Sequence, residues 1–220
     1  MSHALTLFFS ATFGSCLGFV SCVLIQKIDL RTKVSVKKII LLGGCTGLIF
    51  SELIIRRFSA LDLRLCFALL FAALFVQSVV DFYTHRLVRQ ITHAVALSGV
   101  VLLGFSSFQN SLVSAFVAAC VCAVFGAIFS VAINKFSNGS LGIGDVRLIP
   151  VLGLHIGFLS YDTALWALFI ASVLASVFGA ILILVGRGSW KKRIAFGPFL
   201  ALGAVIAIFS NEMLPRLLIA

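Results

Sequence analysis

Two aspartates, Asp81 and Asp145, each stand where a long apolar run meets a polar segment. The chain has only seven acidic residues among 220, and an acid beside a run of membrane length is costly, so each is a candidate functional residue. Two carboxylates that approach closely cannot both ionise, so they share a proton. One can then take a proton from water, while the other hydrogen-bonds a scissile carbonyl and later protonates the leaving amine. This chemistry needs neither a metal nor a cofactor.

Two glycines precede the second acid, in the segment Gly142-Ile143-Gly144-Asp145. Glycine has no Cβ, so it lets a backbone or a substrate strand approach closely, and we interpret both glycines as residues that shape the site. A single Gly-x-Gly-Asp is weak evidence, because glycine is common in membrane helices. It gains weight only if a second carboxylate lies at the same depth and on the same side.

A structural role is the alternative for both acids. Asp81 can pair with His85 or Arg86, whereas Asp145 can pair with Arg147 or cap a helix, as acids at the membrane boundary often do. Position alone leaves the catalytic and the structural interpretations open.

No metal site is predicted. His85 lies one helical turn after Asp81 and His93 eight residues further on, but we interpret them as hydrogen-bonding residues at the membrane interface rather than as metal ligands. The six cysteines lie in or beside apolar runs and form no C-x-x-C pair, so they predict neither a zinc site nor a disulfide framework.

The composition predicts an all-α, polytopic membrane protein. Hydrophobic residues make up 61% of the chain, charged residues 11%, and the mean hydropathy is +1.20, which excludes a soluble globular domain. The length fits about eight transmembrane helices of roughly 20 residues, over the runs 4–25, 39–55, 65–80, 94–105, 112–134, 145–159, 164–186 and 195–210. We divide the chain into an N-terminal two-helix part, 1–64, with a short cytoplasmic loop, and a membrane core, 65–220.

The basic residues indicate the orientation. The net charge is +10, but the charges fall in short loops between apolar runs, which indicates membrane topology and contact with lipid rather than nucleic-acid binding. Thirteen of the 17 Lys and Arg residues lie on one side, and this side is the cytoplasmic one by the positive-inside rule. The rule places Asp81 and Asp145 together at the cytoplasmic boundary of a multi-pass inner-membrane protein, although 64 residues separate them in sequence.

Three segments resemble the motifs of the type IV prepilin peptidases, membrane aspartic proteases of the G-x-G-D class. The family motif D-h-x-T-x-x-L-h-P-x-x-L-T is matched by Asp81, Phe82, Thr84, Leu87, Ile91 and Thr92, with Val88 where proline is usual. The motif G-x-G-D-h-K-L is matched by Gly142, Gly144, Asp145, Val146 and Leu148, with Arg147 in place of lysine. Residues 195–203 are similar to the segment F-G-P-x-L-A-x-G.

The resemblance implies a membrane endopeptidase that removes a basic leader from a prepilin or pseudopilin. It implies that Asp81 and Asp145 are catalytic and that Gly142, Gly144, Arg147 and Thr84 bind substrate or shape the site. Longer members insert a cytoplasmic domain with paired C-x-x-C motifs, where this chain has only the basic loop 26–38. Its absence puts N-methylation of the product in doubt.

Two other functions are alternatives to proteolysis. A small ion- or proton-coupled transporter would use the two aspartates as ion ligands, and inverted repeats with interrupted helices would favour it; the sequence shows no convincing internal repeat. A catalytically inactive relative would serve as an assembly partner, but the retained pair of acids argues against this function.

Overall fold

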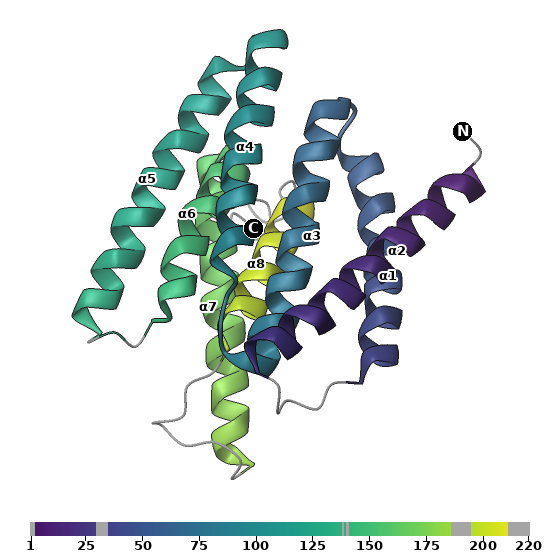
Figure 1. Cartoon of the computed structure of the whole chain (residues 1–220). Coiled ribbons are helices and arrows are strands. Elements are labelled where there is room, and N and C mark those ends of the chain that lie inside the picture. Colours follow the sequence, from purple (N-terminus) through teal and green to yellow (C-terminus); the bar gives the residue numbers. More distant parts are fainter. Residues whose placement is uncertain (1–2, 30–34, 138, 140, 186–194, 211–220) are drawn as a thin grey trace, which may run out of the picture.

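The computed structural model describes residues 3–29, 35–137, 139, 141–185 and 195–210. These ranges hold helices and no strand (Figure 1). The helices are α1 (His3–Ile28), α2 (Val36–Arg57), α3 (Leu61–Thr84), α4 (Arg89–Gln109), α5 (Val113–Phe136), α6 (Ile143–Gly157), α7 (Tyr161–Leu184) and α8 (Gly197–Ser210). The prediction of an all-α bundle with about eight helices is therefore confirmed.

The helices differ in their capacity to cross a membrane. Six of them, α1 to α5 and α7, are long and apolar enough to do so. Helix α6 has 15 residues, or about 22 Å at 1.5 Å per residue, against a hydrocarbon thickness of about 30 Å. The described part of α8 has 14 residues. Helix α6 is thus a short helix packed within the bundle, as its short apolar run predicts.

The connection after Asp81 is much shorter than predicted. The apolar runs 65–80 and 94–105 predict a loop over residues 81–93, but α3 continues to Thr84 and α4 begins at Arg89. The hydropathy signal stops at the first polar residue, whereas helical hydrogen bonding does not. Helix α3 ends where His85 adopts the left-handed conformation, with φ 51° and ψ 36°, and its N–H donates to the Asp81 carbonyl at 2.8 Å. Asp81 therefore lies inside the last turn of a helix.

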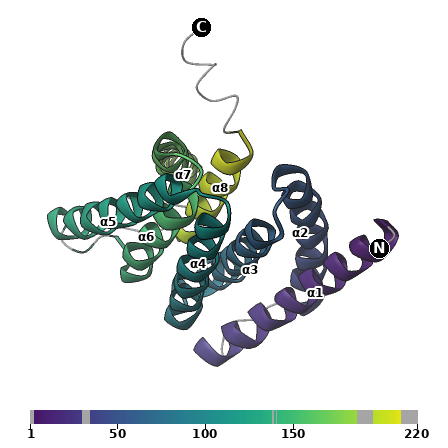
Figure 2. The ribbon, with the colours of Figure 1, turned by 90° about the horizontal axis from the view of Figure 1, so that it is seen from above.

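Helix α3 is central to the arrangement. It contacts α1, α2, α4 and α8, and α6 contacts α4, α5, α7 and α8; in the view from above, α1 and α2 lie on one side of α3 and the other helices on the opposite side (Figure 2). The main core includes Phe67, Leu70 and Phe71 of α3, with Ile156 of α6 and Leu200 of α8. Burial of these large side chains fixes the positions of α3, α6 and α8 relative to one another.

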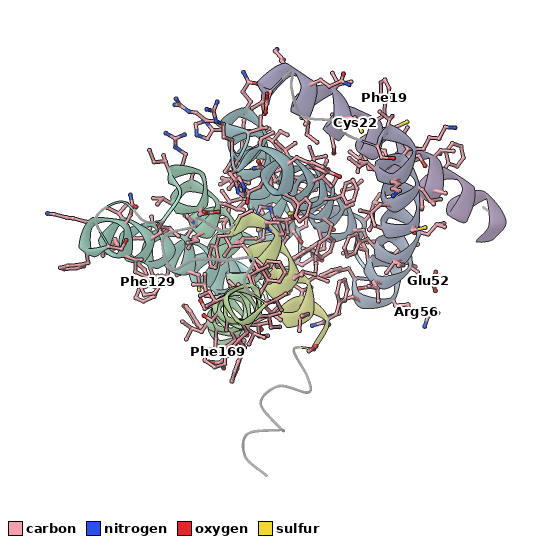
Figure 3. The ribbon with its side chains drawn as sticks, turned by 90° about the horizontal axis from the view of Figure 1, so that it is seen from below. Phe19, Cys22, Glu52, Arg56, Phe129 and Phe169 are labelled. Carbon is pink, nitrogen blue, oxygen red and sulfur yellow. The ribbon has the colours of Figure 1, made fainter. Side chains whose placement is uncertain are left out.

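The outer surface of the bundle is apolar. Phe19, Phe129 and Phe169 are exposed and point outward from α1, α5 and α7 (Figure 3). Large apolar patches on a soluble monomer are rare, whereas lipid tails accept such side chains without cost. The surface agrees with an integral membrane protein.

Candidate active site

The two aspartates lie at the same end of the bundle. Asp81 is in the last turn of α3 and Asp145 in the first turn of α6, and these turns share the lower end of the molecule (Figure 1). Both side chains are nearly buried, with exposed fractions of 5% for Asp81 and 7% for Asp145. Helix direction explains their common depth, since α3 runs toward this end and α6 away from it.

Asp81 is bonded to the start of α8. The backbone N–H of Gly197 donates to Asp81 Oδ2 at 2.9 Å, across 116 residues of sequence. Gly197 is the first residue of α8, where backbone N–H groups lack partners within the helix and the helix dipole favours a negative charge. A Cβ built on Gly197 would lie only 2.8 Å from Asp81 Oδ2. The glycine therefore allows the carboxylate to reach the N–H.

Asp145 is held by its own helix. Gly142 is the N-cap of α6 and Asp145 the third residue inside it, so the Gly142 backbone N–H can donate to the Asp145 carboxylate, as in a capping box. The Asp145 carboxylate does lie beside Gly142, since a Cβ built on Gly142 would be 2.8 Å from Asp145 Oδ2, and the Gly142 N–H lowers the Asp145 pKa. The other carboxylate oxygen, Oδ1, is buried and has no hydrogen-bond partner among the described residues. One oxygen is thus anchored and the other is available.

The electrostatics connect the two carboxylates. Asp145 lies outside the six candidate spans, and burial raises its pKa from 3.8 to about 7. Burial is the larger cause of this shift and the nearby Asp81 carboxylate is the smaller one, while the Gly142 N–H opposes both. The effect of Asp81 means that the two groups are close enough for the charge of one to disfavour the charge of the other.

Leu87 fills the seam between the elements that carry the site. A Cβ built on Gly144 would lie 2.6 Å from Leu87 Cβ, and one built on Gly197 would lie 3.2 Å from Leu87 Cδ2. The Leu87 side chain therefore rests against the starts of both α6 and α8. It joins the Asp81 side of the site to the Asp145 side.

The alternative ion pairs are not formed. No salt bridge within 4.0 Å joins either aspartate to His85, Arg86 or Arg147, all of which lie in the described part of the chain. The capping alternative for Asp145 is realised in part, through Gly142 rather than through a charge. Capping uses one carboxylate oxygen and leaves the second for chemistry.

The other predicted site residues divide into two groups. Gly142 and Gly144 lie beside Asp145 and Leu87, as just described. Thr84 donates its hydroxyl to the Val80 carbonyl of its own helix at 2.8 Å, and Arg147 is exposed on α6. For the last two, a role toward substrate stays a prediction.

Comparison with known proteins identifies the family. A family model described as Type IV leader peptidase family matches residues 68–184, more than half of the chain. The chain belongs to the type IV leader peptidase family. The match includes Asp81, Leu87, Gly144 and Asp145, and it ends before Gly197. No solved structure matches the chain.

The individual relatives of this chain are distant. The Prepilin leader peptidase/N-methyltransferase of Burkholderia pseudomallei (strain 1026b) is 28% identical over 143 residues, which cover 63% of this chain and 44% of that protein. The protein of the same name from Bacillus subtilis (strain 168) is 27% identical over 87 residues, 40% of this chain and 34% of that protein. The protein of the same name from Aeromonas salmonicida (strain A449) is 32% identical over 76 residues, which cover 34% of this chain and 25% of that protein. The chain thus aligns with less than half the length of each of these relatives.

Three contributors to the site were not identified from sequence. Gly197 and Leu87 fall in recognised motifs, but their contacts with the aspartates' helices depend on tertiary packing. Gln77 is buried one turn before Asp81 and bonds the following loop. Its signal was available, because an amide inside the apolar run 65–80 is costly unless it has a structural or functional partner.

Proposed function

We propose that this chain is an aspartic endopeptidase that cleaves the basic leader from a type IV prepilin or pseudopilin at the membrane boundary. The observation that carries the proposal is the buried pair of carboxylates, Asp81 and Asp145, held within electrostatic reach at the meeting point of α3, α6 and α8. Family membership supports proteolysis as the reaction class.

The surroundings of the two acids suggest distinct starting roles. Both carboxylates are buried and each has a backbone N–H beside it, that of Gly197 for Asp81 and that of Gly142 for Asp145. We assign the proton to Asp145, whose pKa is raised to about 7. In the proposed reaction, Asp81 takes a proton from the attacking water while Asp145 donates its proton to the scissile carbonyl oxygen. In this scheme the leaving amine is protonated by Asp81, the carboxyl that took the water proton, rather than by the carboxyl that hydrogen-bonds the carbonyl. Asp145 recovers its own proton as the carbonyl of the acid product forms.

The proposed substrate suits a site at this depth. A prepilin of the family type carries a short basic leader, a glycine before the cut and an apolar helix that stays in the lipid. Its scissile bond then meets the enzyme where water from the cytoplasm and the apolar bundle adjoin. N-methylation is not part of the proposal, because residues 26–38 provide no C-x-x-C motif.

The site is placed on the cytoplasmic side of the inner membrane. The support is the excess of basic residues at the end of the bundle that carries both aspartates. Cysteines introduced at Phe108 and Phe136, both exposed at opposite ends of the α4–α5 hairpin, test this orientation. A membrane-impermeant thiol reagent should label Phe108→Cys in intact cells and Phe136→Cys only after lysis; the reverse pattern would move the site to the other side.

A reconstituted cleavage assay tests the proposed function. The purified chain in lipid nanodiscs is mixed with a prepilin, and the mass of the product shows whether the leader is lost at the glycine junction. The Asp145→Asn protein is the control for contaminating proteases. If wild-type protein leaves every tested prepilin and pseudopilin intact, the proposal fails, and a proton-flux assay in vesicles would test the transporter alternative.

A further inference from the structure

A polar clamp inside α3 holds the loop beside the carboxylates. Gln77 is 1% exposed and lies four residues before Asp81, so both side chains are on the same face of the helix. Its Nε2 donates to Thr92 Oγ1 at 2.7 Å, and its Oε1 accepts the backbone N–H of Val88 at 2.7 Å. A single amide thus bonds both the end of the connection and the first turn of α4.

The clamp adds two hydrogen bonds to a short connection whose Leu87 and Val88 pack against apolar cores. Only residues 85–88 separate α3 from α4. Val88 is the N-cap of α4, and its side chain provides no capping hydrogen bond. Thr92 is 3% exposed, and its hydroxyl oxygen accepts the hydrogen bond from Gln77. Both the N–H and the oxygen of this buried amide have a partner. Loss of either partner would leave an unpaired polar group in the bundle, so the pair of hydrogen bonds makes the connection rigid.

The residue that this connection carries is Leu87. Val88, its neighbour, is the residue whose N–H Gln77 binds, so the clamp determines where Leu87 enters the seam. Leu87 rests against Gly144 of α6 and Gly197 of α8. Gly144 precedes Asp145, and Gly197 bonds Asp81. The chain of contacts therefore runs from Gln77 through the connection to both sides of the aspartate pair.

We infer that Gln77 is a positioning residue for the proposed cleavage reaction: through Val88, Thr92 and Leu87 it sets the separation of Asp81 and Asp145. The inference rests on the proposed function for its catalytic consequence. The hydrogen bonds of Gln77 go to Thr92 and Val88 rather than to the carboxylates, and its action is to keep α6 and α8 at the distance that Leu87 imposes. Catalysis is sensitive to such placement, since a shift of about 1 Å can lower a rate by about 100-fold.

Kinetics of matched variants provide the first test. Gln77→Leu removes both hydrogen bonds, and Thr92→Val removes the hydroxyl while keeping the shape; Thr92→Ser retains the hydroxyl and is the rescue variant. In reconstituted protein we expect Gln77→Leu and Thr92→Val to lower kcat by at least about 10-fold with KM changed less than about 2-fold, because the chemistry rather than binding is misplaced. Thr92→Ser should keep the wild-type kcat.

Two control variants separate positioning from general loss of polar groups. Gln109→Leu makes the same change at an exposed position at the end of α4. Ser98→Ala removes a hydroxyl that bonds only its own helix, at the Val95 carbonyl. Both should retain the wild-type kcat. A folded Gln77→Leu protein with the wild-type kcat would overturn the inference, and so would a Thr92→Ser protein as slow as Thr92→Val.

A distance measurement tests the clamp without any substrate. Spin labels at Arg86 and Ile143, both exposed, report the separation of the connection from the start of α6. We expect a narrow distance distribution in the wild-type background and a broader one with Gln77→Leu or Thr92→Val. If wild-type protein cleaves no prepilin, the proposed function fails while the broadening still tests the clamp. An unchanged distribution in both variants would overturn the clamp itself.

Discussion

Glycine serves opposite purposes in the two halves of this molecule. Between α1 and α2, a Cβ on Gly18 would lie 2.6 Å from the Ile39 carbonyl oxygen, and one on Gly47 would lie 2.5 Å from the Ser10 carbonyl oxygen. At the aspartate pair, the atoms that meet Gly144 and Gly197 belong instead to side chains of Leu87 and Asp81. The glycines of the first seam, between α1 and α2, bring two helix backbones together. The glycines of the second seam, where α3, α6 and α8 carry the aspartates, make room for the side chains proposed to do chemistry.

We infer from this difference that the first seam mainly determines the stability of the fold and the second mainly the activity. Close backbone approach through small residues is how membrane helices associate, so the α1–α2 seam contributes to the fold. The seam at α3, α6 and α8 holds two buried acids, one of them with an oxygen that lacks a partner, and such groups oppose folding. Substitutions in the first seam should mainly change stability, whereas those in the second should mainly change the rate of cleavage.

The largest effect is expected from the acids of the second seam. Asp81→Asn and Asp145→Asn keep the side-chain shape but cannot accept and return a proton, and general acid–base catalysis is typically worth about 10²–10⁴ in rate. Single-turnover cleavage should fall by at least this range, while membrane insertion is retained because asparagine brings no charge into the buried site. Asp62→Asn and Asp162→Asn, far from the site, should cleave normally; an equal loss in these controls would contradict the assignment.

A glycine-to-alanine substitution should lower the cleavage rate in the second seam and the free energy of unfolding in the first. In Gly197→Ala the new Cβ would displace the Asp81 carboxylate from its N–H donor, and a hydrogen bond to a charged group is worth about 1.5–3 kcal/mol, or roughly 10- to 100-fold in rate. Gly18→Ala should leave kcat unchanged but lower the free energy of unfolding by about 1–3 kcal/mol, as overpacking does. Cleavage rates and thermal unfolding of both variants check the comparison, which fails if Gly18→Ala lowers kcat as much as Gly197→Ala.

The pH dependence should follow the shared proton. The pKa of Asp145 is raised to about 7, so the proposed proton donor is present below this pH and is lost as the pH rises through it. Cleavage should therefore decline above about pH 7, and it should also decline in acid once Asp81 is protonated as well. Initial rates from pH 4 to 9, with folding checked by circular dichroism at each pH, measure both limbs. A rate that is constant between pH 6 and 9 would argue against Asp145 as the donor.

The smallest effect is expected at the exposed edge of the site. Arg147 is exposed and forms no ion pair with Asp145, so Arg147→Lys, which keeps the positive charge, should change kcat/KM by less than about 3-fold, the scale of a weak surface interaction. The same assay with purified variant protein checks this value. A loss of 100-fold would show that the guanidinium geometry itself is required and would enlarge the site beyond the seam.

The sequence predicts the depth of the two acids but not how they are held. Helix alternation and the positions of Asp81 and Asp145 at the ends of apolar runs were sufficient to place both at one end of the bundle. The Gly197–Asp81 hydrogen bond links residues 116 positions apart, and hydropathy contains no information on which helix starts lie side by side. The extent of α3 and α4 was missed for a related reason, because polar residues at a membrane boundary can continue a helix.

The central claim, that Asp81 and Asp145 act as one unit, is tested most directly by the double variant. Single-turnover cleavage of a reconstituted prepilin is measured for wild type, Asp81→Asn, Asp145→Asn and Asp81→Asn/Asp145→Asn. Groups that share a proton and act in one step are strongly non-additive, so the account predicts that the double variant is no slower than the slower single variant. Losses that multiply in the double variant, or a wild-type rate in either single variant, would contradict it.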